Sequence, residues 1–171
     1  MAHTVLKIRD LGAHFPVYAN DQTFKPGSRG GGGTTENWKR FQKAVEISDG
    51  SGASTTDEVF IMYAQHRMLI VVAYVVPIDG DITLNAATYA TWSIINRGIL
   101  GAGVGVAATL NTSATSLSQY EPSSMTVNNG TAAVIGTRGS VFTVTLAKES
   151  SGVATGPCLV CVVAKAIEEH H

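Results

Sequence analysis

Histidines are the commonest metal ligands and general bases, and this chain places few of them where they could act together. The five are His3, His14, His66, His170 and His171. Only His66 falls within the region that we expect to form strands, and it lies in a predicted turn. A metal-dependent enzyme on a β-scaffold would need two or three histidines and a glutamate on adjacent strands. We therefore interpret His66 as a solvated side chain and expect no catalytic residues and no enzyme activity.

The two cysteines, Cys158 and Cys161, lie in an apolar run that we expect to be a strand. Residues i and i+3 of a strand point to opposite faces, so this pair is poorly placed for a disulfide or a shared metal. A zinc site would also need a second pair of ligands, which the sequence does not show. We expect two small buried thiols and no metal.

Two short segments resemble ligand-binding loops, but each lacks a necessary part. The Gly101-x-Gly103-x-Gly105 segment has neither the lysine and hydroxyl residue of a P-loop nor a following helix, so we interpret it as a flexible linker between strands. Asp79 and Asp81 flank a glycine, but a calcium ion needs about six to eight oxygens. This second segment is better explained as a hairpin turn. We expect no cofactor.

The composition points to contacts with other proteins. Hydrophobic residues make up 44% of the 171 residues and charged residues only 15%, against about 25% in a typical soluble domain. Residues 1–47 carry seven Lys/Arg against four Asp/Glu, whereas residues 48–171 carry five against nine. The net charge of −1 argues against nucleic acid as a partner, and the longest apolar run, 68–78, is too short to cross a bilayer. We expect some of the outer surface to be covered by neighbouring proteins.

The chain divides into an N-terminal segment, 1–56, and an all-β domain, 57–167. The N-terminal segment combines a short strand at 4–8 with a basic, glycine-rich arm. Within it, residues 35–47 fit either a helix or a strand, and periodicity does not decide between them. In the domain, alternating and β-branched runs predict strands at 58–64, 68–76, 82–85, 91–96, 105–110, 125–128, 132–136, 141–148 and 158–164. This spacing predicts a β-sandwich or jelly roll with an extended N-terminal arm.

Several of these strands resemble a known family. The segments 91–98 (TWSIINRG) and 107–112 (AATLNT), followed by 139–146 (GSVFTVTL) and a final strand at 158–164, are similar to the jelly-roll cement, or decoration, proteins of tailed-bacteriophage capsids. The resemblance covers residues 57–165. At 138–141 the chain reads Arg-Gly-Ser-Val, without the acidic residue that usually opens this strand in the family.

The resemblance implies a structural virion protein that binds the outer surface of the capsid and cements neighbouring copies of the major capsid protein. It also implies a dimer or trimer that is made in the host cytoplasm and ends on the capsid surface of the virion. We expect Lys39, Arg40 and Lys43, with Trp38 and Phe41 as apolar anchors, to contact the capsid. In the alternative interpretation, Trp38 and Phe41 cap one end of the sandwich core. The alternative function is a tail fibre or spike module that binds a glycan on the host surface.

Overall fold

The computed structural model describes residues 40–48, 56–83, 85–148 and 155–167. The predicted strand at 4–8 and the two predicted contact residues Trp38 and Lys39 lie outside the described residues. Arg40 and Phe41 are described through their backbone alone.

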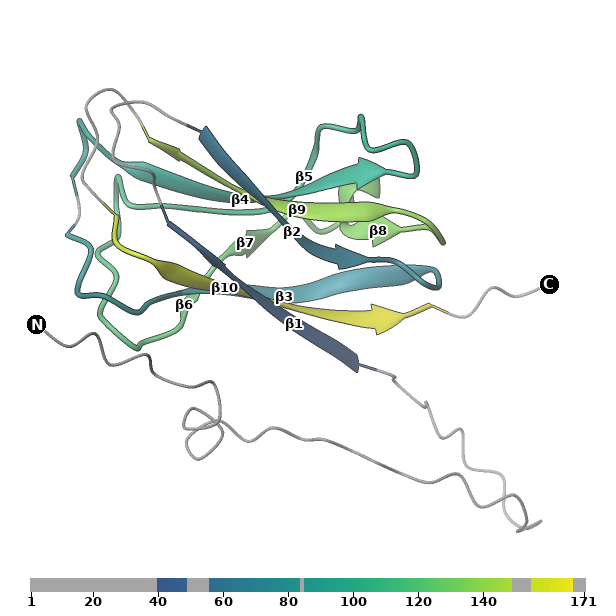
Figure 1. Cartoon of the computed structure of the whole chain (residues 1–171), viewed down its shortest axis with the longest axis horizontal. Coiled ribbons are helices and arrows are strands. Elements are labelled where there is room, and N and C mark those ends of the chain that lie inside the picture. Colours follow the sequence, from purple (N-terminus) through teal and green to yellow (C-terminus); the bar gives the residue numbers. More distant parts are fainter. Residues whose placement is uncertain (1–39, 49–55, 84, 149–154, 168–171) are drawn as a thin grey trace, which may run out of the picture. The chain divides into compact units, whose positions relative to one another are not determined.

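The described residues form two antiparallel sheets that pack face to face (Figure 1). The first sheet has the order β1-β10-β3-β6, with β8 also paired to β3. Its strands are β1 (Arg40–Ile47), β10 (Cys158–Ala166), β3 (Met68–Pro77), β6 (Ser123–Ser124) and β8 (Ile135–Gly136).

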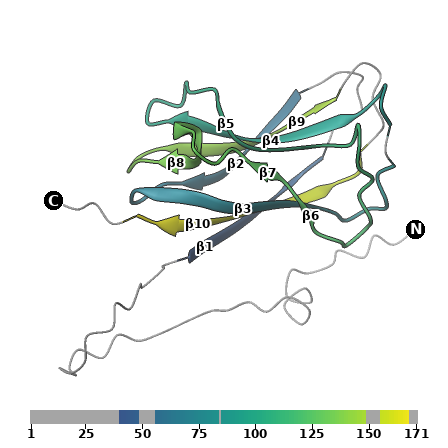
Figure 2. The same cartoon turned by 180° about the vertical axis from the view of Figure 1, so that it is seen from behind.

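The second sheet has the order β2-β9-β4-β5-β7 and lies over the first, as the reverse view also shows (Figure 2). Its strands are β2 (Thr56–Tyr63), β9 (Val141–Lys148), β4 (Ala90–Gly98), β5 (Gly105–Asn111) and β7 (Thr126–Val127). A short 3-10 helix, η2 (Ala132–Val134), precedes β8. No described helix is long and apolar enough to cross a membrane.

The strand pairing is nested along the chain. The first strand pairs with the last (β1 with β10), the second with the last but one (β2 with β9), β3 with β6 and β8, and β4 with β5. A long antiparallel ribbon that rolls up on itself gives this order, which is that of a jelly roll. The predicted all-β sandwich is therefore confirmed.

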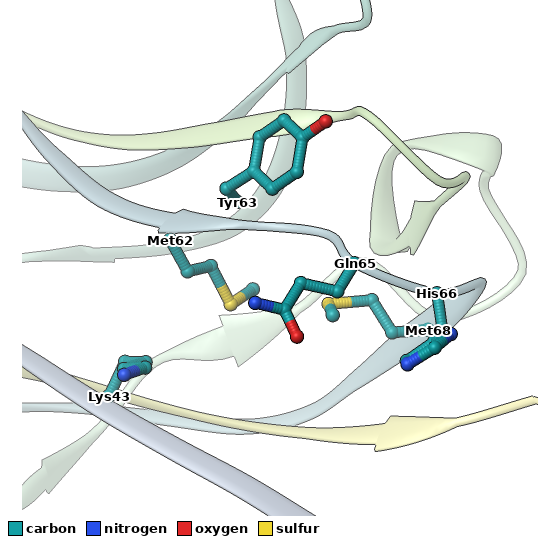
Figure 3. A pocket seen from close by; sticks show the side chains of 6 residues that line it. All are labelled: Lys43, Met62, Tyr63, Gln65, His66 and Met68. Atoms are coloured by element: carbon teal, nitrogen blue, oxygen red, sulfur yellow. The ribbon is translucent and has the colours of Figure 1, made fainter.

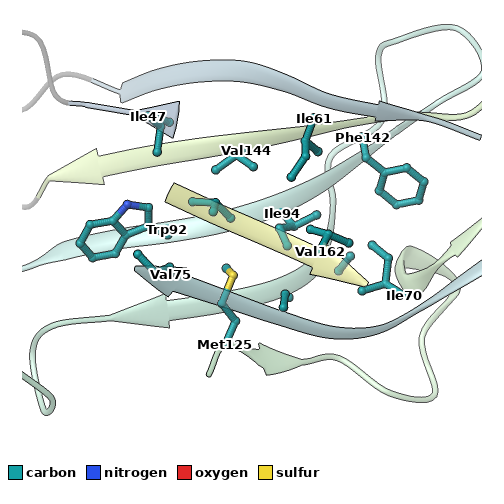
Figure 4. Close-up of a cluster of buried hydrophobic side chains, with 14 of the residues drawn as sticks. Ile47, Ile61, Ile70, Val75, Trp92, Ile94, Met125, Phe142, Val144 and Val162 are labelled. Atoms are coloured by element: carbon teal, nitrogen blue, oxygen red, sulfur yellow. The ribbon is translucent and has the colours of Figure 1, made fainter. Parts of the chain in front are cut away.

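The core lies between the two sheets and is formed by alternate residues of each strand (Figure 4). Trp92 from β4 and Phe142 and Val144 from β9 meet Val75 from β3 and Val162 from β10, and none of these side chains is more than 1% exposed. The indole Nε1 of Trp92 is buried without a hydrogen-bond partner among the described residues. Trp92 thus contributes to the core as an apolar side chain.

Six of the predicted strands are present with ends shifted by at most two residues (β2, β3, β4, β5, β9 and β10). Three predictions were wrong in extent. Residues 82–85 provide a single bridge, between Ile82 and Leu117, and 125–128 contribute only the two residues of β7. Residues 132–136 begin as η2 and end as the two-residue β8, because Ile135 N–H bonds back to Ala132.

The sequence of residues 35–47 fitted either a helix or a strand, and the structure has a strand over residues 40–47. Every residue of β1 pairs with β10, from Arg40 opposite Lys165 to Ile47 opposite Cys158. The sandwich therefore includes a strand from within the 1–56 segment, which we had assigned to the arm.

The two cysteines lie on opposite faces of β10, as their spacing predicted. Cys158 is fully buried in the core, whereas Cys161 pairs with Ala44 and Tyr74 on the outer face and is 6% exposed. Neither forms a disulfide. Burial raises the pKa of the Cys161 thiol to about 11, from an ordinary value of 9.0.

We expect Cys161 to resist alkylation in the native protein at pH 8, because the thiolate is the reactive form and burial disfavours it. The same shift stabilises the fold below pH 9, and this contribution is lost as the pH rises from about 9 towards about 11. Iodoacetamide labelling read by mass spectrometry checks the first point, and urea unfolding at pH 8 and pH 10.5 checks the second. A native labelling rate equal to that of the unfolded chain would contradict the assignment.

Candidate partner-binding surface

The outer face of the second sheet carries a transverse row of mainly apolar side chains. In register, Phe60 of β2 lies opposite Thr143 of β9, Thr143 opposite Ile95 of β4, and Ile95 opposite Val106 of β5. We call these four residues the outer row. Phe60 is 57% exposed and Val106 36% exposed, whereas the two central residues are largely covered by their neighbours.

A β-bulge extends this apolar surface along β2. The register of β2 shifts between Phe60 and Met62, which turns Met62 into the interior and Tyr63 outward, opposite Val141. Tyr63 is 54% exposed, and its hydroxyl lies near Gly139, where a Cβ would also meet Ile99. The aromatic surface of β2 thus approaches the connection between β4 and β5.

Two opposite charges on this face neutralise each other. The Arg97 guanidinium donates from Nε to Glu58 Oε1 and from Nη2 to Glu58 Oε2, each at 2.7 Å. The Thr143 hydroxyl and the Arg97 guanidinium near the Glu58 carboxylate hold the pKa of Glu58 below its usual value. The pair spans β9 and leaves the described part of the face without net charge.

Arg97 also fixes the β4–β5 hairpin. Its Nη1 donates to the Gly103 carbonyl oxygen at 3.0 Å, and the Gly103 amide donates to the Arg97 carbonyl oxygen at 2.8 Å. Asn96 Nδ2 donates to the carbonyl oxygens of Ala133 and Ile135, which ties the hairpin base to η2 and β8. We predicted a flexible linker here from its glycines, but the segment is a hydrogen-bonded hairpin.

Glycine is required in this hairpin for two different structural reasons. Gly98 and Gly101 have positive φ angles of 67° and 72°, which L-residues with side chains rarely adopt. A Cβ on Gly103 would lie 2.6 Å from the Asn96 carbonyl oxygen, so only glycine fits. The hairpin consequently projects three apolar side chains, Ile99, Leu100 and Val104, which are 64%, 93% and 78% exposed. We call these three residues the hairpin tip.

A small open pocket of about 160 Å³ lies where β1 approaches β2 (Figure 3). Met62 and Met68 are both 5% exposed and point into it, and the exposed side chains of Lys43 and His66 stand at its edge. The exposed Gln65 side chain reaches from the turn towards Met62. Tyr63 also contributes to the lining, but its ring points away from the other side chains. The pocket therefore has a thioether floor and a rim of hydrogen-bond donors.

The structure places one predicted contact residue with its side chain described. Lys43 lies on β1 with an exposed side chain, at the pocket edge. Arg40 and Phe41 are at the start of the same strand. Sequence reasoning did not find the outer row or the hairpin tip, since both depend on strands that are distant in sequence; the run from Gly98 to Tyr120 without a charged residue was the available signal.

The predicted turns fit the observed backbone. Gly80 and Gly130 have φ angles of 116° and 90°, and Asp81 Oδ1 accepts a hydrogen bond from the Gln119 amide at 2.7 Å. Within the described ranges, no three His, Cys, Asp or Glu side chains are close enough to hold a metal ion. His66 is exposed in the turn between β2 and β3.

The chain matches no protein-family model, and no curated protein or solved structure shows significant similarity to it. The likeness to capsid cement proteins therefore rests on sequence motifs alone.

Proposed function

We propose that this chain is a structural protein of a tailed-phage virion that binds the outer surface of the capsid and cements neighbouring major capsid subunits. The observation that carries the proposal is the outer row together with Tyr63 and two residues of the hairpin tip, Ile99 and Val104. Phe60, Tyr63, Val106, Ile99 and Val104 are exposed and apolar, and the ion pair described on this face, Glu58–Arg97, is already satisfied. Exposed apolar surfaces of this kind mark protein–protein contacts.

The geometry suits a cementing task because the surface is both broad and rigid. It spans all four long strands of the second sheet, and each is paired along most of its length with a neighbouring antiparallel strand. A rigid surface loses little conformational entropy when it binds, so more of the contact energy remains available to hold the shell together. In this proposal the chain performs no reaction and needs no cofactor.

Residues 38–43, of which 40–43 belong to β1 of the sandwich, supply a second attachment in the same proposal. Lys39, Arg40 and Lys43, with Trp38 and Phe41 as apolar anchors, contact the capsid close to the start of the sandwich. Two linked attachments raise the overall affinity, because the second binding step becomes intramolecular once the first has formed. The partners are the major capsid protein and other copies of this chain, and the location is the capsid surface of the virion.

Reversing the charges of Lys39, Arg40 and Lys43 to glutamate is expected to abolish capsid decoration without unfolding the domain. Lys43 is exposed on an edge strand, so its replacement removes no core contact. Co-sedimentation with capsid shells that lack the protein measures decoration, and thermal unfolding of the variant controls for the fold. Normal decoration by a folded triple variant would show that these three residues are not needed for binding to the capsid.

A further inference from the structure

Leu100 is the most exposed large apolar side chain of the described chain, at 93%. It stands at the end of a hairpin that is fixed at its base by Arg97 and whose backbone there requires glycine at positions 101 and 103. The backbone that carries Leu100 is therefore ordered while the leucine side chain remains in solvent. A protein that binds through this position therefore has little further ordering to complete.

The pocket between β1 and β2 has the size and lining to receive one such side chain. An apolar cavity of about 150 Å³ accommodates a benzene-sized group, and this open pocket measures about 160 Å³. Its floor is made by Met62 and Met68, whose flexible thioethers adapt to the shape of an apolar guest. Both methionines are already buried, so the floor exists before any guest arrives.

The charges of the two sites are compatible. The hairpin segment 98–104 contains no ionisable residue, so it brings no buried charge into the pocket. Lys43, Gln65 and His66 around the pocket can donate hydrogen bonds. The contact pairs an uncharged tip with a rim of donors.

We propose that the Leu100 side chain of one copy inserts into the Met62–Met68 pocket of a second copy. The two sites are different surfaces of one chain, so each copy offers one tip and one pocket. Such a contact forms either twice in a two-fold dimer, with each tip in the other copy's pocket, or head to tail in a ring or an open chain of copies. The inference concerns the purified protein alone and holds whether or not a capsid is the final partner.

Two variants, each with one cysteine added to the two native ones, test the contact when they are mixed. Leu100→Cys places a thiol on the tip, and Gln65→Cys places one at the pocket rim, while the native Cys158 and Cys161 are at most 6% exposed. Under mild oxidation, an equimolar mixture is expected to give a disulfide between position 100 of one chain and position 65 of another, since an inserted tip brings the two within disulfide distance. Each variant alone should give far less dimer. Peptide mass spectrometry identifies the linked residues.

Substitution without cross-linking gives an independent measurement. Leu100→Ser is expected to weaken self-association at least about tenfold in sedimentation equilibrium, because the buried leucine surface is lost. Val104→Ser is the matched control, being 78% exposed on the same hairpin but outside the proposed insertion, and should change association less than about threefold. A mixture without the 65–100 link, a dominant 100–100 link, or equal effects of the two serine variants would each overturn the proposal.

Discussion

Replacing Trp92 by alanine is expected to lower the free energy of unfolding by about 3–5 kcal/mol, close to the whole stability of many domains. The side chain is fully buried in the core between the two sheets, towards one end of the cluster (Figure 4). Its removal leaves a cavity that the surrounding strands, fixed by their ladders, close only in part. Urea unfolding followed by far-UV circular dichroism measures the loss.

Trp92→Phe is the matched control for this effect. It retains most of the aromatic volume and removes a buried N–H that has no hydrogen-bond partner among the described residues. Removing a buried donor without a partner stabilises the fold and offsets part of the packing energy that is lost. The decrease in the free energy of unfolding should therefore be well below that caused by Trp92→Ala. Equal destabilisation by the two variants would contradict the assignment of Trp92 as an apolar core residue.

The double variant Phe60→Ser/Tyr63→Ser is expected to weaken binding to capsid shells by about thirtyfold or more while leaving the sandwich folded. A single aromatic hot-spot residue in an interface contributes about 2 kcal/mol or more, which corresponds to about thirtyfold in affinity. Both side chains are more than half exposed, so their loss removes little core packing. Binding is measured by co-sedimentation at a series of protein concentrations.

The control for the double variant is Val72→Ser on the opposite sheet. Val72 is an exposed apolar residue of β3, at 41%, but it lies on the outer face of the other layer. It should bind shells as the unmodified protein does. Loss of binding by Val72→Ser, with normal binding by the double variant, would show that the first sheet contacts the capsid. This result would contradict the assignment of the contact to the second sheet.

The long strands could be predicted because their pattern is local. Alternation and β-branched residues define β3, β4, β9 and β10 within windows of eight to ten residues, and turn dipeptides such as Asp79-Gly80 separate them. The short elements could not be predicted in the same way. In 132–136 a 3-10 turn competes with extended backbone, and two residues of β8 pair only because β3 lies beside them.

The partner-binding surface could not be predicted from any short stretch of the sequence. Strict alternation along β2 would turn Tyr63 inward with Ile61 and leave Met62 outside, and the bulge after Phe60 reverses both. The outer row joins four strands whose order follows from the rolled topology. β1 was ambiguous because Phe41, Val45 and Ile47 fit a strand face while the preceding residues also fit a helix, and its pairing with β10 decides for the strand.

The most direct test of the proposed function is co-sedimentation of the purified, unmodified protein with capsid shells that lack it, followed by heating of the shells. The proposal predicts saturable binding to the shells and a higher temperature of shell disruption once the protein is bound. A protein that stays in the supernatant with shells, but binds host cells or their surface polysaccharide, would contradict the cementing function and support a tail module that recognises a glycan.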